Sequence, residues 1–147
     1  MASIRNGWGF LQAYMALAKA RRLLEKRGLK EAQRAMLRPW KSKSRNLLQD
    51  DHLASWVEER VLTACRWQVK ETLCFPRAAA AYALLRNAGA QPVLYVGMRA
   101  RPFEAHAWVE VDGSAVADAM SAEDRQRLKV IGCYPLAQQE GADIGAL

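Results

Sequence analysis

The sequence predicts an α+β fold, because helical patterns fill its first part and strand patterns follow them. Apolar residues recur at helical spacing in residues 8–27 and 53–65. Short apolar runs bounded by turn residues then follow at 92–97 and 106–118. A length of 147 residues suits one domain with a core of useful size. We therefore expect a single domain in which a few helices pack on a small antiparallel sheet.

The N-terminal third is predicted to be helical. A helix over residues 8–27 ends at Gly28, and a shorter helical stretch follows over residues 29–37. Residues 38–46 are polar and rich in turn formers, which predicts a loop. We divide the chain into a basic helical extension over 1–46, a core over 47–136 and a loose tail over 137–147.

The core begins with a helix over 53–65, which Asp50 or Asp51 caps. Gly89 ends the next helix, and Ser121 starts a capping box ahead of a short one. The predicted elements after residue 65 are a helix over 76–86, a strand over 92–97, a basic loop over 98–104, a hairpin over 106–118, a short helix over 121–129 and a last strand over 130–136.

The positive charge is concentrated at the N-terminus. The chain has a net charge of +7, and residues 1–45 carry twelve Lys or Arg and only two Glu. Residues 46–147 carry ten basic and thirteen acidic residues, so the basic character does not belong to the core. Basic helices can bind nucleic acid or an anionic membrane. No Gly-rich or aromatic-interleaved motif accompanies this segment, so we expect a solvated face rather than a nucleic-acid partner.

The cysteines favour a reduced, cytoplasmic setting. Cys65, Cys74 and Cys133 are odd in number, and their spacing fits neither a disulfide framework nor a zinc site. The apolar run near the N-terminus is broken by Gln12 and Lys19, unlike a signal peptide. No apolar stretch is long enough to span a bilayer.

A cysteine, a histidine and an aspartate occur in an order that suits a thiol nucleophile. Cys74 precedes the strong helix over 76–86, His106 begins a strand and Asp118 ends the next one. Pro76 fits a first helical turn, so Cys74 lies at the positive end of the helix dipole. A helix N-terminus and an imidazolium can lower a thiol pKa to roughly 3.5–7.5. We predict Cys74, His106 and Asp118 as a catalytic triad that requires no cofactor or metal.

The register of the hairpin decides whether His106 and Asp118 can meet. In a two-residue type I′ turn Val111 pairs with Ser114, and His106 and Asp118 face opposite sides. In a three-residue turn, Val111-Asp112-Gly113, the glycine adopts a left-handed conformation and forms a bulge. Glu110 then pairs with Ser114, and His106 and Asp118 become direct cross-strand neighbours. The chemistry favours the bulged register, although the sequence leaves both open. If the hairpin does not adopt the bulged register, Glu110 or Asp112 would have to be considered as the carboxylate of the triad.

Other residues near the triad admit a functional interpretation, although packing or solvation is the more frequent role. Trp67 and Gln68 lie just upstream of Cys74, where they would line a cleft or supply an oxyanion donor. Arg99 and Arg101 precede the histidine strand and would contact a peptide. Cys65 and Cys133 have no nearby base, so we expect them to be structural.

The segment from about Leu73 to Ala119 resembles the transglutaminase-like cysteine peptidases that mature lasso peptides. The run Phe-x-Ala-His-Ala-Trp-Val-Glu at 103–110 is the most specific element, and Cys-x-x-Arg at 74–77 is less so. The strand 93–97 and Asp118 also match. Related enzymes usually have Leu where this chain has Phe75, which changes the volume of a cleft wall.

The resemblance implies a papain/transglutaminase-like core, in which a helix bearing Cys74 packs on a small antiparallel sheet bearing His106 and Asp118. It implies removal of the leader from a ribosomally made precursor, after which a separate ATP-using cyclase ties the threaded ring. Some relatives carry a leader-recognising domain of helices and strands ahead of the peptidase. Residues 1–45 show no strand alternation, so the chain is similar to the stand-alone form. Its implied partners are the precursor, a separate leader-recognition protein and the cyclase.

Two other functions remain open at this point. A transamidase or deamidase on the same core would share the acyl-thiol intermediate and differ only in the acceptor. A non-enzymatic module would use the basic segment 1–45 on nucleic acid or membrane, and a salt-dependent affinity for random duplex would favour it.

Overall fold

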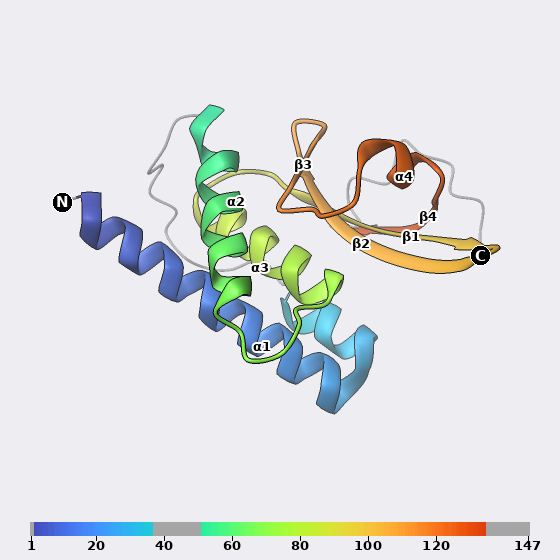
Figure 1. The fold of residues 1–147 in the computed structure, drawn as a ribbon, viewed down its shortest axis with the longest axis horizontal. Helices are drawn as coiled ribbons and strands as arrows, with labels where there is room; N and C mark the ends of the chain where they lie inside the picture. The colour runs from blue at the N-terminus through green and yellow to red at the C-terminus, as the bar shows by residue number, and fades with distance from the viewer. Residues whose placement is uncertain (1, 37–50, 135–147) are drawn as a thin grey trace.

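The computed structural model describes residues 2–36 and 51–134 (Figure 1). Its elements in chain order are α1 (Ala2–Met36), α2 (Asp51–Arg66), α3 (Cys74–Asn87), β1 (Val93–Ala100), β2 (Phe103–Val111), β3 (Ser114–Val116), α4 (Ala122–Gln126) and β4 (Lys129–Tyr134). The strands form one four-stranded antiparallel sheet in the order β3-β2-β1-β4. This is the predicted α+β arrangement. The predicted loop at 38–46, the tail at 137–147 and a cap at Asp50 lie outside the described residues.

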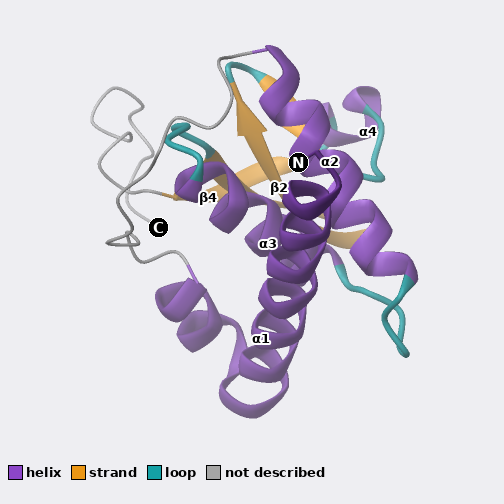
Figure 2. Cartoon of the chain, turned by 90° about the vertical axis from the view of Figure 1, so that its left-hand side faces the viewer, coloured by secondary structure: helices purple, strands orange, loops and turns teal. Residues whose placement is uncertain are grey.

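Helix α3 is the centre of the molecule. It contacts α1 and α2 on one side and β1 and β2 on the other, with the long helices all on the same side of the sheet (Figures 1 and 2). The run from Ala78 to Ala81 is buried throughout, as are Tyr82 and Leu85. Methyl side chains let neighbouring elements approach the helix closely on every face. As predicted, α3 ends just before Gly89, which adopts a positive φ of 91°.

Helix α1 consists of two helices that meet at Gly28. Gly28 has φ 79° and ψ 175°, a conformation outside the helical region, so the predicted stop at this residue is confirmed. Ahead of the break, Ala13, Leu17 and Ala20 are fully buried at helical spacing. After it, Ala32 joins the same core cluster. None of the described helices combines the length and apolar character that a membrane crossing needs.

The prediction of a loop over 98–104 is wrong, because these residues extend the β1–β2 hairpin. Met98 pairs with Ala105, and Arg99 pairs with Glu104. The last pair also forms an ion pair, with Arg99 Nη2 2.7 Å from Glu104 Oε2. Opposite charges directly across an antiparallel ladder stabilise it. The charged residues therefore support the strands here instead of ending them.

The predicted three-residue bulged turn between β2 and β3 is also wrong. Val111 pairs with Ser114, so the turn is the two-residue one at Asp112-Gly113. Asp112 has φ 50° and Gly113 has φ 79°. A type I′ turn needs positive φ at both central residues, and Asp-Gly is among the pairs that tolerate it best. The positive φ of Gly113 is as expected, but the register is the alternative one.

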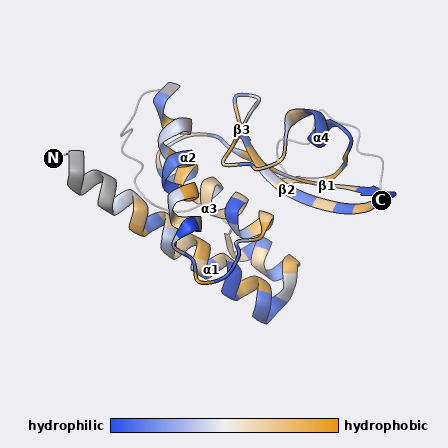
Figure 3. Cartoon of the chain, viewed as in Figure 1, coloured by the Kyte–Doolittle hydropathy of each residue, from blue (hydrophilic) through white to orange (hydrophobic). Residues whose placement is uncertain are grey.

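Helix α4 is short, hydrophilic and without buried residues (Figure 3). Ser121 caps it, and its hydroxyl accepts a hydrogen bond from the N–H of Asp124 at 3.2 Å. This is the cap that the sequence predicts. β4 then returns to pair with β1 and completes the sheet.

Candidate active site

Cys74 is the first residue of α3, and Leu73 is the N-cap. Pro76 lies within the first turn, where the missing N–H leaves no helical hydrogen bond unmade. The N–H groups of a first turn have no partner inside the helix, and they carry the positive end of the dipole. The sequence predicts that Cys74 just precedes this helix, and in the structure Cys74 is the first residue of the helix. Its thiol sits where negative charge is stabilised.

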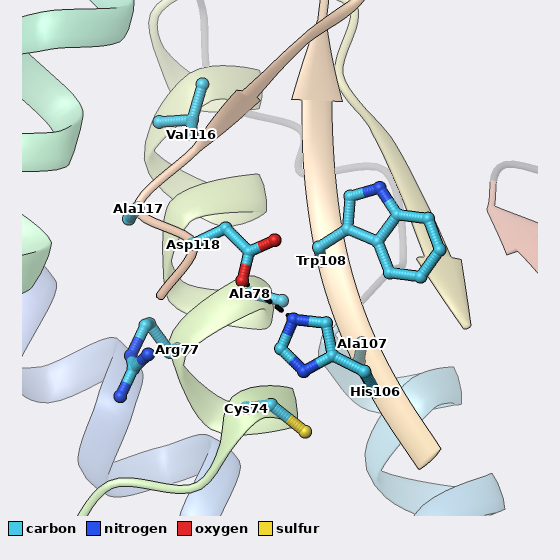
Figure 4. Close-up of a pocket in the computed structure, with 9 residues that line it drawn as sticks. All are labelled: Cys74, Arg77, Ala78, His106, Ala107, Trp108, Val116, Ala117 and Asp118. Atoms are coloured by element: carbon cyan, nitrogen blue, oxygen red, sulfur yellow. Dashed lines mark hydrogen bonds and ion pairs between the residues drawn. The ribbon is translucent and has the colours of Figure 1, made fainter. Parts of the chain in front are cut away.

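His106 lies on β2 opposite Gly97 and is held between the other two residues (Figure 4). Its Nε2 is 2.7 Å from Asp118 Oδ1. The other ring nitrogen points toward Cys74, and the interaction with His106 lowers the pKa of the Cys74 thiol. The structure thus brings Cys74, His106 and Asp118 into one chain of contacts.

Asp118 reaches His106 by a route that the sequence did not reveal. The β2–β3 ladder stops at Val116, and Ala117 adopts a positive φ of 56°. This left-handed residue turns the backbone, so Asp118 is not bound by the strand alternation that would have pointed it away. The N–H of Ala117 donates to Glu58 Oε1 on α2 at 3.0 Å, which holds the turn against the helices. The contact with His106 is therefore made despite the two-residue register.

Asp118 is buried and fully engaged. Its side chain is only 3% exposed. Besides His106, its carboxylate accepts from the N–H of Met120 at 3.1 Å and from Arg125 Nη1 at 2.7 Å. Burial acts to raise the pKa of Asp118, but the hydrogen bond from His106, the Met120 N–H and the Arg125 guanidinium outweigh it, and the pKa lies below its usual value. The carboxylate stays ionised.

The pKa values of Cys74 and His106 are shifted in opposite directions. Hydrogen bonds to Asp118 and Cys74 raise the pKa of His106 to about 9. Burial acts to raise the pKa of Cys74, but the hydrogen bond to His106 and the backbone N–H groups of Ala107 and Phe75 lower it below 9.0. A raised imidazole pKa and a lowered thiol pKa both favour transfer of the thiol proton to His106. Both shifts therefore act toward a thiolate–imidazolium pair.

An aromatic stack fixes the plane of the His106 ring. The ring lies on Trp108 with centroids 5.9 Å apart and planes 14° apart, and Trp108 stacks in turn on Tyr95 at 5.5 Å. Trp108 Nε1 donates to Glu110 Oε1 at 3.0 Å, which orients the indole. A Cβ on Gly97 would meet Trp108 at 3.1 Å, so glycine leaves room for the indole. Glu110 therefore accepts a hydrogen bond from Trp108, and the carboxylate bonded to His106 is that of Asp118.

The three residues border one small pocket, whose lining is Cys74, Arg77, Ala78, His106, Ala107, Trp108, Val116, Ala117 and Asp118 (Figure 4). Arg77 is the one arginine or lysine in this lining. Its Nη2 donates to the carbonyl of Thr72 at 3.3 Å. The sequence drew attention to Arg77 only as part of a motif, and it gave no signal for Ala117 or for Arg125 behind Asp118.

The remaining candidates from the sequence lie elsewhere. Trp67 is 70% exposed, and Gln68 lines a second cavity against α1. Arg99 is engaged by Glu104. Phe75, expected in a cleft wall, is buried in the core instead.

Neither of the other cysteines borders the pocket. Cys65 packs against the core from α2, and Cys133 pairs across to Tyr95 on the sheet. In the described part of the chain, no group of three His, Cys, Asp or Glu side chains is arranged to hold a metal ion.

Comparison with known proteins assigns the family. The family model described as the Transglutaminase-like superfamily matches residues 10–133, which include α1 from Phe10 onward, the Cys74 helix and the whole sheet apart from its last residue. No curated protein and no solved structure gives a significant match. Members of this superfamily are commonly cysteine peptidases or transamidases, which accords with a thiol enzyme. With its helix-borne cysteine packed on a small antiparallel sheet, the chain belongs to the transglutaminase-like superfamily.

Proposed function

We propose that the chain is a cysteine peptidase that removes the leader from a ribosomally made lasso precursor peptide. The observation that carries the catalytic part is the chain of contacts from Cys74 through His106 to Asp118 at a helix N-terminus. The substrate class rests on the resemblance of residues 73–119 to lasso leader peptidases, above all in the run at 103–110.

The reaction follows from the protonation state of the pair. The Cys74 thiolate attacks the carbonyl carbon of the scissile amide, and the oxygen takes up the negative charge. The N–H groups of the first turn of α3 are placed to stabilise that oxyanion. His106 gives its proton to the leaving amine as the C–N bond breaks, leaving a thioester on Cys74. Neutral His106 then takes a proton from water, whose oxygen attacks the thioester and releases the acid and the Cys74 thiolate, which restores the starting pair.

The same thioester can meet an amine instead of water. Membership of the transglutaminase-like superfamily keeps transamidation or deamidation as a second candidate. The first step is shared, so the products alone separate the activities. Hydrolysis of a peptide bond gives two fragments whose masses sum to the precursor plus one water, whereas attack on a glutamine side chain releases ammonia.

The decisive experiment is mass analysis of a precursor peptide encoded beside the gene, incubated with the purified chain. We expect a leader fragment and a core fragment with the unaltered chain and neither with Cys74→Ala, because the acyl acceptor is lost. Cys65→Ala and Cys133→Ala are matched controls that should retain cleavage. Loss of ammonia without fragments would assign the transamidase class, and survival of activity in Cys74→Ala would remove the nucleophile.

The partner is the second part of the proposal. We propose that a separate leader-recognition protein docks beside α1, where a cavity of about 330 Å³ opens between α1 and the segment that leads to Cys74. Its lining includes Arg21, Arg22 and Glu25 of α1 together with Gln68 and Val69, and Arg21 forms an ion pair with Glu25. An excess of basic over acidic groups here suits an acidic segment, either of the recognition protein or of the leader it presents.

Charge reversal tests this docking. The variant Arg21→Glu/Arg22→Glu should lose most of the stimulation that a recognition protein gives to cleavage, and the stimulation of the unaltered chain should weaken with salt. The control is Arg127→Glu, which changes an exposed arginine at the end of α4. Full cleavage by the lone chain, or unchanged stimulation of the double variant at an unchanged Tm, would contradict the proposal.

A further inference from the structure

Arg125 approaches the buried carboxylate of Asp118 from the side opposite His106. Its Nη1 donates to Asp118 Oδ2 at 2.7 Å and also to the backbone carbonyl of Met120. The Arg125 side chain is 17% exposed, although α4 itself lies at the surface. The guanidinium is therefore directed inward, away from solvent.

The three donors divide the carboxylate between them. Oδ1 receives His106 Nε2 and the N–H of Met120, whereas Oδ2 receives Arg125. The last torsion of an aspartate side chain has broad minima, so bonds at one oxygen alone leave the plane of the group loosely defined. A bond at each oxygen fixes that plane. Arg125 is the partner that holds the second oxygen.

The backbone around Asp118 is held by the Ala117 N–H, which donates to Glu58 Oε1, and the Met120 N–H donates to Asp118 itself, but neither bond reaches Oδ2. β3 has three residues, and the chain leaves it through the left-handed Ala117. Arg125 closes a loop from Asp118 to α4, and Ser121 caps that helix inside the same loop. The guanidinium thus ties the turn, the loop and α4 into one unit.

We propose that Arg125 is a positioning residue for the reaction, which holds the Asp118 carboxylate in the plane that keeps Oδ1 on His106 Nε2. The inference rests on the triad of the proposed function. Arg125 touches neither Cys74 nor the pocket, so it acts through Asp118 alone.

Two roles of Arg125, positioning Asp118 or acting only as a nearby charge, predict opposite shifts of the His106 pKa when Arg125 is removed. The ionisable groups around His106 are Cys74, Arg77, Glu110, Asp118 and Arg125. As a nearby cation, Arg125 disfavours a second positive charge, so removing only its charge would raise the pKa of His106. As a positioning residue it maintains the bond from His106 to Asp118, so removing it would lower that pKa toward 6.5. The sign of the shift distinguishes the two roles.

The experiment is an NMR titration of His106 in the full chain with Cys74→Ala as the background, which needs no substrate. The chain has two histidines, so His52→Gln identifies the signals. We expect Arg125→Met to lower the His106 pKa by at least half a unit, on the order of a threefold change in protonation. Arg125→Lys should restore part of the shift, because an ammonium can still donate to Asp118 but cannot reproduce the planar, rigid geometry of the guanidinium. Arg127→Met, on an exposed arginine two residues along, is the matched control and should change nothing.

An unchanged or raised His106 pKa in Arg125→Met would overturn the proposal. If that variant does not fold, Arg125→Gln is judged by the same criterion. With Cys74 restored, kcat on an activated ester should fall by on the order of 10²-fold in Arg125→Met while KM stays within about twofold. A triad that proves inactive on every substrate would remove the proposed function and leave the titration result standing.

Discussion

His106 and Asp118 are in contact, yet the chain positions them in different ways. His106 lies on a nine-residue strand, where it pairs with Gly97 of β1, and its ring is stacked on Trp108. Asp118 follows a three-residue strand and a left-handed residue, and side chains from distant elements hold it. Glu58 on α2 fixes the turn and Arg125 on α4 fixes the carboxylate. The imidazole of His106 is thus positioned mainly by its strand and ring stack, whereas the carboxylate of Asp118 is positioned by side-chain contacts.

The largest effect on this comparison should come from Asp118→Asn. An amide keeps the shape but lets the imidazole adopt the wrong tautomer, so kcat should fall by on the order of 10⁴-fold. The measurement is the rate of precursor cleavage or ester hydrolysis at fixed pH. Asp112→Asn in the exposed turn is the control, and we expect it to retain full activity. Equal rates for the two variants would show that His106 is held by its strand and ring stack alone.

The pH profile should report the same contact. His106 has a raised pKa of about 9, so the imidazolium that protonates the leaving group is present below that pH and is lost as the pH rises through it. We expect kcat/KM to decline above about pH 9 and to fall tenfold per further unit. In Asp118→Asn the decline should begin at lower pH, because the largest cause of the raised pKa is gone. An alkaline limb that does not move would separate Asp118 from the titration.

An intermediate effect should follow loss of the support from α2. Glu58→Ala leaves the partly buried N–H of Ala117 without its acceptor, which should cost about 1–3 kcal/mol of unfolding free energy. Denaturant unfolding measures it, and Glu59→Ala, with a side chain 67% exposed, is the control. Activity should fall along with stability. A destabilised Glu58→Ala with full activity would mean that Arg125 alone suffices to place Asp118.

The smallest effect should come from Ala117→Gly. Alanine at φ 56° carries the cost of a left-handed conformation, which glycine avoids. We expect the free energy of unfolding to rise by about 1 kcal/mol or less. Ala115→Gly, in the extended β3, should lower it by about 0.5–1 kcal/mol. Destabilisation by Ala117→Gly would indicate that the alanine methyl, buried beside the pocket, contributes packing that outweighs the strain.

The sequence could predict the parts of this site that depend on local pattern. Apolar spacing and glycine stops gave the helices, and Gly28 and Gly89 end them as expected. The helix start placed Cys74, and strand alternation placed His106. Both signals are contained within a few consecutive residues.

What the sequence could not show depends on contacts between distant residues. Charged residues at 98–104 suggested a loop, whereas the cross-strand Arg99–Glu104 pair makes them a strand extension. The position of Asp118 depends on a left-handed alanine, which no propensity favours, and on an acceptor fifty-nine residues away. No pattern in the sequence marked Arg125, because only the folded loop turns its side chain inward.

The buried alanines of α3 give α1 an indirect influence on the chemistry. α3 is packed between α1 and the sheet, so the width of a helix bearing methyl groups sets how far apart those two layers lie. Cys74 is on that helix and His106 is on the sheet, so the thiol–imidazole separation is one dimension of the stack. A bulkier side chain at Ala79 or Ala80 would act as a spacer between layers. The distance between the Cys74 thiol and the His106 ring therefore depends on the packing of the whole fold, including the packing of α1 on the outer face of α3.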